Sequence, residues 1–202
     1  MLINIVHPYT FKLIGDTLQI GQVEEFNARD KSISDFVNFA LDSKASCLVH
    51  KYIDDNVLRE IMHKTALQTD PYYNFIFDSR IDTIRTTPYG VPIPDEKPKE
   101  IPKEEWKYCK RIFSLDFELK QKFTGHDTII FIGGVLEYCL INAISYCCGN
   151  YKLNNETYLY IPEFCVSFDE VQKDKCKERL KELDVNEITS GEAIDIIKIN
   201  RK

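Results

Sequence analysis

Residues 127–148 read DTIIFIGGVLEYCLINAISYCC, the most apolar stretch of the chain. It holds two adjacent glycines, Gly133 and Gly134, and its only interior charge is Glu137. A helix that spans a bilayer needs roughly 20 apolar residues, and this stretch is long enough. A span would, however, place the glycine pair, Glu137 and Asn142 in lipid, where polar groups are costly. The composition therefore favours a strand, a glycine turn and a helix.

The two halves of the stretch have different periodicities. Residues 128–132, TIIFI, are β-branched and aromatic, which predicts a buried parallel strand. Between residues 137 and 148, four apolar side chains recur at helical spacing: Leu140, Ile141, Ile144 and Cys148. This spacing predicts a helix whose apolar stripe, including Cys148, packs against the strand.

The rest of the chain repeats the alternation. Further strands are predicted at residues 2–6, 47–53, 157–162 and 186–189, and helices at 34–45, 56–65, 113–123, 169–183 and from residue 189 onward. Ser34 is the predicted N-cap of the first helix, and Thr189 with Glu192 forms a capping-box pair at the last. Alternating elements of this kind predict an α/β fold: a three-layer, mostly parallel sheet of about six strands with helices on both faces.

In the helix at 169–183, three side chains are predicted to point inward: Val171, Cys176 and Leu180. The alternation is interrupted by a proline-rich segment at about residues 86–103, which is unsuited to the interior of a sheet or helix. This segment is either an exposed loop or a lid or subunit-contact arm. The chain length of 202 residues favours a single domain, residues 1–202.

Charge and cysteine usage narrow the function classes. The net charge is −6 and no block of Lys and Arg stands apart, so we expect no nucleic-acid partner. Seven cysteines without C-x-x-C spacing indicate neither a disulfide framework nor a zinc site. Neither a signal peptide nor a membrane anchor is predicted. We therefore expect a cytoplasmic protein with a small-molecule substrate, no cofactor and no metal.

The segment from Gly133 to Cys139, GGVLEYC, resembles the nucleophile segment of the isochorismatase-like cysteine hydrolases, which include nicotinamidases and N-carbamoyl amidohydrolases. The resemblance implies that Cys139 is the nucleophile at the start of a helix. It also implies a cis peptide bond between Gly134 and Val135, and a substrate and oxyanion site formed by Gly134, Val135 and Tyr138. The superfamily further implies a homo-oligomer.

Two other catalytic residues follow from the same resemblance. KRIFSLDF, residues 110–117, is similar to the family's lysine segment, so Lys110 is the candidate catalytic lysine, with Arg111 and Lys107 as alternatives. The family's catalytic aspartate ends its first strand, where this chain has His7. Asp16, in FKLIGDTLQ, is therefore the candidate for that aspartate.

Some members of the superfamily carry a metal site, an Asp with two nearby His after the second strand. Here the only similar residues are His50, Asp54 and His63, which we interpret as ordinary half-buried or surface residues. The expected function is cysteine-dependent hydrolysis of a small amide or carbamoyl compound through a thioester. The alternative is a degenerate member that binds a small molecule or a protein without turnover.

Overall fold

A computed structural model describes residues 1–8, 20–51, 75–86, 115–152, 155–165, 167 and 169–200. Its strands are β1 (Leu2–Val6), β2 (Ser46–Lys51), β3 (Asp82–Arg85), β4 (Thr128–Gly133), β5 (Thr157–Tyr160) and β6 (Val185–Glu187). Its α-helices are α2 (Ile20–Asp42), α5 (Leu115–Phe123), α6 (Ile141–Asn150), α7 (Glu170–Glu182) and α8 (Ser190–Ile199). A π-helical turn, η4 (Leu136–Leu140), precedes α6, and a 3₁₀ turn, η5 (Pro162–Phe164), follows β5.

The six strands form one parallel sheet in the order β3-β2-β1-β4-β5-β6. The chain builds outward from β1 in one direction and then, from β4, in the other, so the order reverses between β1 and β4. These two strands are in register from Leu2 opposite Ile129 to Val6 opposite Gly133. Their carboxyl ends therefore lie side by side.

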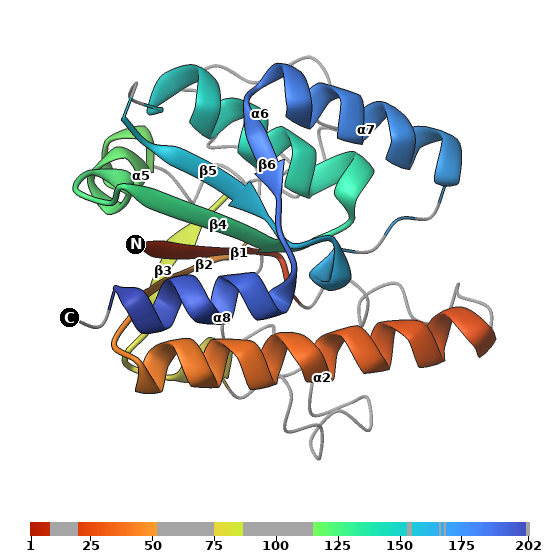
Figure 1. The fold of residues 1–202 in the computed structure, drawn as a ribbon, viewed down its shortest axis with the longest axis horizontal. Coiled ribbons are helices and arrows are strands. Elements are labelled where there is room, and N and C mark those ends of the chain that lie inside the picture. Colours follow the sequence, from red (N-terminus) through yellow and green to blue (C-terminus); the bar gives the residue numbers. More distant parts are fainter. Residues whose placement is uncertain are drawn as a thin grey trace.

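Helices cover both faces of the sheet (Figure 1). The alternation of side chains along β1 explains how both faces become apolar. Ile3 and Ile5 join the core cluster beneath α2 and α8, whereas Leu2 and Val6 join the cluster beneath α5, α6 and α7. A strand buried on both faces needs a nearly continuous apolar sequence, which LINIV supplies.

The predicted three-layer sheet is confirmed, but individual elements differ. The sequence did not predict β3 as a strand, and α2 begins at Ile20, so Ser34 is a buried interior residue and its prediction as an N-cap is wrong. Thr189 and Glu192 do form the predicted capping box. The helix predicted at 56–65, and the proline-rich segment beyond Thr86, lie outside the described residues.

Two predictions about buried helix residues are wrong. Val171 is 65% exposed, although Cys176 and Leu180 are buried as predicted. In α6 the core thiol is Cys147, which is 1% exposed, whereas Cys148 is half-buried. The buried side of α6 runs through Leu140, Ala143, Ile144 and Cys147, an i, i+3, i+4, i+7 pattern, so Cys148 lies at its margin.

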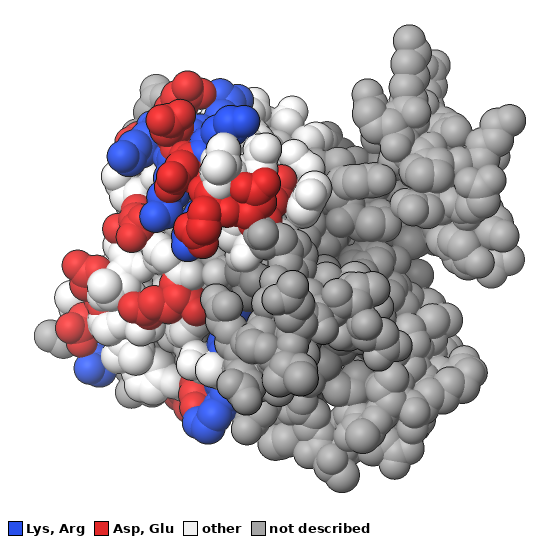
Figure 2. All heavy atoms as spheres, turned by 90° about the vertical axis from the view of Figure 1, so that its right-hand side faces the viewer, with Lys and Arg blue, Asp and Glu red and all other residues white. Residues whose placement is uncertain are grey.

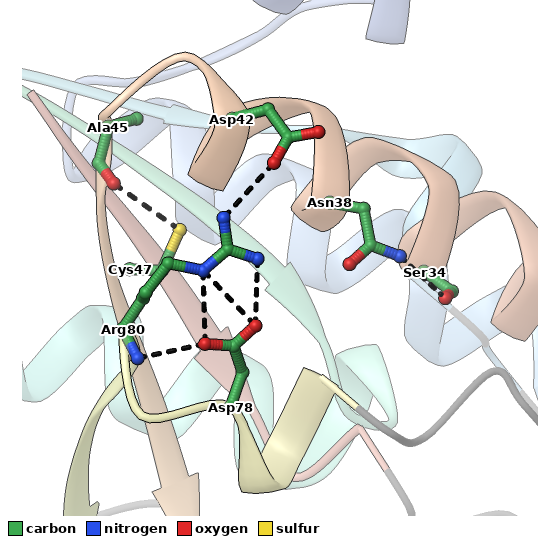
Figure 3. A network of polar contacts seen from close by, with 7 residues as sticks. All are labelled: Ser34, Asn38, Asp42, Ala45, Cys47, Asp78 and Arg80. Atoms are coloured by element: carbon green, nitrogen blue, oxygen red, sulfur yellow. Dashed lines mark hydrogen bonds and ion pairs between the residues drawn. The ribbon is translucent and has the colours of Figure 1, made fainter.

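Arg80 ties α2 to the amino-terminal end of the sheet (Figure 3). Its guanidinium donates to Asp42, the last residue of α2, at 3.0 Å, and to Asp78 before β3 at 2.8 Å. Hydrogen bonds from Arg80 lower the pKa of Asp78 to about 2. The Cys47 thiol donates to the Ala45 carbonyl at 3.8 Å beside this network. These contacts fix the carboxyl end of α2 far from the carboxyl ends of the strands.

Within the described part of the chain, no helix combines the length and apolar character that crossing a membrane requires.

Candidate active site

The carboxyl ends of β1 and β4 mark the expected position of a ligand site. In open parallel sheets, ligands bind beyond the carboxyl ends of the strands, at the point where the strand order reverses. In this chain that point is where Val6 pairs with Gly133. Figure 2 looks onto this end of the molecule, where the described residues carry acidic and basic side chains interspersed.

Gly133 and Gly134 form a sharp turn at this point. Both have positive φ, +95° and +52°, in the region that favours glycine. A β-carbon on Gly133 would lie 2.5 Å from the Val6 carbonyl oxygen, and one on Gly134 would lie 2.9 Å from the Cys139 Sγ. The predicted cis bond between Gly134 and Val135 is wrong: that bond is trans. Left-handed backbone at the two glycines makes the turn instead.

Cys139 lies in η4, with its sulfur folded back onto this turn. The Val135 backbone N–H donates to the Sγ at 3.4 Å, and the Sγ lies 3.8 Å from the Val135 carbonyl oxygen. The residue is 3% exposed, and its burial raises the pKa of the thiol. Backbone hydrogen bonds oppose that rise, the one from Val135 most strongly, and the charge of Arg29 also opposes it. The thiol is thus held among groups that stabilise negative charge.

The two residues before Cys139 face more open surroundings. Glu137 is half-buried in the first turn of η4. Tyr138 is 59% exposed, which is unusual for a large aromatic side chain. Its ring is therefore available to contact a ligand or another protein surface.

His7 stands at the end of β1, where the resemblance expects an aspartate. It has a positive φ of 43° and is fully buried. Its Nε2 lies 2.9 Å from the Thr86 Oγ1, just beyond β3. Since β2 separates β1 from β3, this contact turns the His7 ring away from β4 and Cys139.

His50, in β2, is also fully buried, which contradicts its interpretation as a half-buried or surface residue. Neither of its ring nitrogens has a hydrogen-bond partner among the described residues. Burial lowers the pKa of His50 to about 3 and that of His7 well below its ordinary value. Both rings are therefore neutral at physiological pH.

Known structures with this architecture identify the fold. Pyrazinamidase of Pyrococcus horikoshii in complex with zinc is similar at 10% identity and a TM-score of 0.56, over 93% of this chain and 98% of that one. Pyrazinamidase/nicotinamidase of Streptococcus mutans is similar at 15% identity and a TM-score of 0.55, over 93% of this chain and 100% of that one. N-carbamoylsarcosine amidase of Thermoplasma acidophilum is similar at 9% identity and a TM-score of 0.50, over 94% of this chain and 95% of that one. This chain has the isochorismatase-like hydrolase fold.

The sequence comparisons give no match, since neither a protein-family model nor a curated protein sequence resembles the chain significantly. The predicted fold class, an isochorismatase-like α/β fold, is nevertheless confirmed. At such low identities the likeness shows the isochorismatase-like fold alone.

Several residues that the resemblance singled out lie outside the described residues: Asp16, Lys110, Lys107, Arg111, Asp54 and His63. What the structure does bring together is Gly134, Val135 and Cys139. Across the described ranges, no group of three or more His, Cys, Asp or Glu is arranged to hold a metal ion.

Sequence reasoning missed Arg29 and Asp30, a buried pair on α2 that reaches the Gly134 turn of the candidate site. Arg29 is 5% exposed and its Nη1 donates to the Gly134 carbonyl at 3.3 Å. The predicted helix began at Ser34, so neither residue was assigned to a helix. A correctly placed helix start could have revealed the pair, because adjacent charges on its inward face would have stood out.

Proposed function

We propose that this chain is a cysteine hydrolase that cleaves the C–N bond of a small amide or carbamoyl compound through a thioester on Cys139. The observation that carries the proposal is the position of the Cys139 Sγ. It lies against Gly134 and accepts the Val135 N–H at the point where the strand order reverses. The names of the solved structures with this fold, pyrazinamidase, nicotinamidase and N-carbamoylsarcosine amidase, support amide hydrolysis as the reaction class.

In the proposed reaction, the Cys139 thiol transfers its proton to Asp16, and the thiolate attacks the carbonyl carbon of the amide. A C–S bond forms, the C–N bond breaks, and the amide nitrogen leaves as ammonia with the transferred proton. Water then cleaves the thioester, which releases a carboxylic or carbamic acid and restores the thiol. Lys110 is the proposed cation that lowers the pKa of the thiol and holds Asp16.

The proposed substrate site surrounds the same turn. Backbone N–H groups near Val135 and Cys139 would stabilise the negative oxygen that develops on the carbonyl. Gly134 would let the substrate approach the backbone closely, and the exposed ring of Tyr138 would cover a planar substrate. A small, planar amide matches these features.

Ammonia release from nicotinamide, pyrazinamide and N-carbamoylsarcosine tests the proposal. We expect turnover of at least one of them by the native chain and none by Cys139→Ser. Cys148→Ser is the matched control, because Cys148 is a half-buried thiol on the following helix. Rapid alkylation of Cys139 by iodoacetamide at neutral pH should accompany turnover. Labelling of Cys139 no faster than that of the other cysteines, together with no ammonia release, would refute the hydrolase.

A second candidate function is binding without turnover. The observation that favours it is His7, which occupies the end of β1 and points its ring toward Thr86. The residue that directly follows β1 is thus an imidazole and not a carboxylate. Calorimetric binding of an amide that the chain does not hydrolyse, unchanged in Cys139→Ser, would support this function over the first.

We also propose that the chain is a homo-oligomer, in which the large apolar side chains exposed in the described part of the chain, Tyr138, Val171 and Ile199, could contact another subunit. A monomeric mass in light scattering at micromolar concentration would rule this out. The expected cytoplasmic location stays a prediction.

A further inference from the structure

Arg29 and Asp30 form an ion pair that is almost completely removed from solvent. Their side chains are 4% and 1% exposed. The Arg29 Nε donates to the Asp30 Oδ1 at 2.9 Å, and the Nη2 contacts the same oxygen. Taking two charges out of water is costly, so a buried pair is weak evidence for a gain in stability. The reason for burying this pair is therefore sought in the groups that Arg29 contacts.

The guanidinium links α2 to both strands at the reversal point. Nη1 donates to the Gly134 carbonyl at 3.3 Å, and Nη2 lies 3.5 Å from the Pro8 carbonyl oxygen. Gly134 follows β4 and Pro8 follows β1. The amino-terminal end of α2 extends past the carboxyl ends of the strands (Figure 1), which places a buried cation at this edge of the sheet.

The Cys139 sulfur lies against the same residue that Arg29 holds. A β-carbon on Gly134 would be 2.9 Å from the Sγ, and the next backbone N–H, that of Val135, points at the Sγ from 3.4 Å. Fixing the Gly134 carbonyl fixes the peptide plane that carries the Val135 N–H, because the peptide unit is rigid. Arg29 thus controls the direction of the donor as well as the local charge.

We propose that Arg29 is a positioning residue for Cys139: it orients the Gly134–Val135 peptide toward the sulfur and supplies the positive charge that favours the thiolate. The catalytic consequence rests on the proposed function, whereas the effect on the thiol does not. The charge of Arg29 favours the Cys139 thiolate, and Asp30 is a counter-ion of Arg29. The charges of Arg29 and of the Cys139 thiolate also act on Cys165, which follows η5, so this thiol belongs to the same environment.

Titration of the Cys139 thiol tests the proposal. For each variant, the ultraviolet absorbance of the thiolate is measured against pH, and that of its Cys139→Ser counterpart is subtracted. In Arg29→Met we expect the apparent pKa to rise by about one unit, a ten-fold loss of thiolate at neutral pH. Arg29→Lys keeps the charge but not the planar fork, so the rise should be smaller. Arg80→Met removes a half-exposed surface cation from the other end of the sheet and should change nothing.

Asp30→Asn gives a second, opposite test. It keeps a hydrogen-bond acceptor beside Arg29 but removes the negative charge, so the apparent pKa of the Cys139 thiol should fall. Circular dichroism establishes which variants are folded. An unchanged thiol titration in folded Arg29→Met, or in folded Asp30→Asn, would overturn the proposal. The readout needs no substrate, so a chain that hydrolyses no amide would refute the proposed function and leave this result intact.

Discussion

The Val6 carbonyl oxygen lies 2.5 Å from the position that a β-carbon on Gly133 would occupy. The two residues are partners in the register of β1 and β4. The obstacle is backbone in the centre of the sheet, so it cannot move aside without separating the strands. Gly133 also has a φ of +95°. Close approach and backbone conformation therefore both require glycine here.

Gly133→Ala should consequently lower the free energy of unfolding by at least about 2 kcal/mol, measured by urea denaturation. Gly125→Ala is the matched control, because Gly125 also has a positive φ, 88°, but no atom within 4 Å of its β-carbon position. Gly125→Ala should lower the free energy of unfolding by about 1 kcal/mol, the cost of placing alanine in a left-handed backbone conformation. Equal losses in the two variants would show that the contact with Val6 contributes nothing.

Gly134→Ala should affect the proposed chemistry more than stability. Its β-carbon would lie 2.9 Å from the Cys139 Sγ, so the sulfur would have to shift. A displacement on the order of 1 Å at a reacting atom can reduce turnover about 100-fold. We expect a large loss of amide hydrolysis with a smaller loss in unfolding free energy than in Gly133→Ala. Turnover at the native rate would contradict the assignment of Cys139 as nucleophile.

Much of the fold could be predicted because it depends on local patterns. The runs LINIV and TIIFI are apolar on both faces and short, which is typical of central parallel strands. The third strand was missed because DTIR, Asp82–Arg85, is polar and only four residues long. Its strand character comes from pairing with β2. Sequence periodicity does not record such a long-range contact.

The site was less predictable for a different reason. Cys139 and the glycines lie in one short segment, so sequence resemblance found them together. Arg29 reaches Gly134 across 105 residues of chain, and His7 reaches Thr86 across 79. Nothing in a linear sequence shows that these partners meet. The direction of the His7 ring also depends on an uncommon positive φ, which the sequence does not indicate.

Cys147 and Cys148 differ in burial, which gives a paired prediction. Cys147 is 1% exposed in the cluster beneath α5, α6 and α7, whereas Cys148 is half-buried. Cys147→Ser would place a hydroxyl in that apolar cluster and should cost about 1–3 kcal/mol of unfolding free energy. Cys148→Ser should cost less, and neither should alter the reactivity of Cys139. If Cys148→Ser lowered the free energy of unfolding more than Cys147→Ser in urea denaturation, Cys148 would be the core thiol of this helix.

Stability should fall as the pH drops below about 6.5, because buried His7 and His50 are kept neutral. Burial lowers the pKa of His50 to about 3 and that of His7 below its ordinary value. In the unfolded chain both bind protons from about pH 6.5 downward. In the folded chain both rings stay neutral at that pH. Their contribution to the unfolding free energy is therefore complete above about pH 6.5 and is lost as the pH falls toward their pKa values in the folded chain. Each histidine contributes a slope of up to about 1.4 kcal/mol per pH unit.

Urea denaturation between about pH 6.5 and 5, before the carboxylates titrate, should show this slope. His50→Leu should reduce the slope by the contribution of one histidine. His126→Gln, at a half-buried site where the pKa is also lowered, should reduce it less. An unchanged slope in His50→Leu would show that His50 is not held neutral in the folded chain.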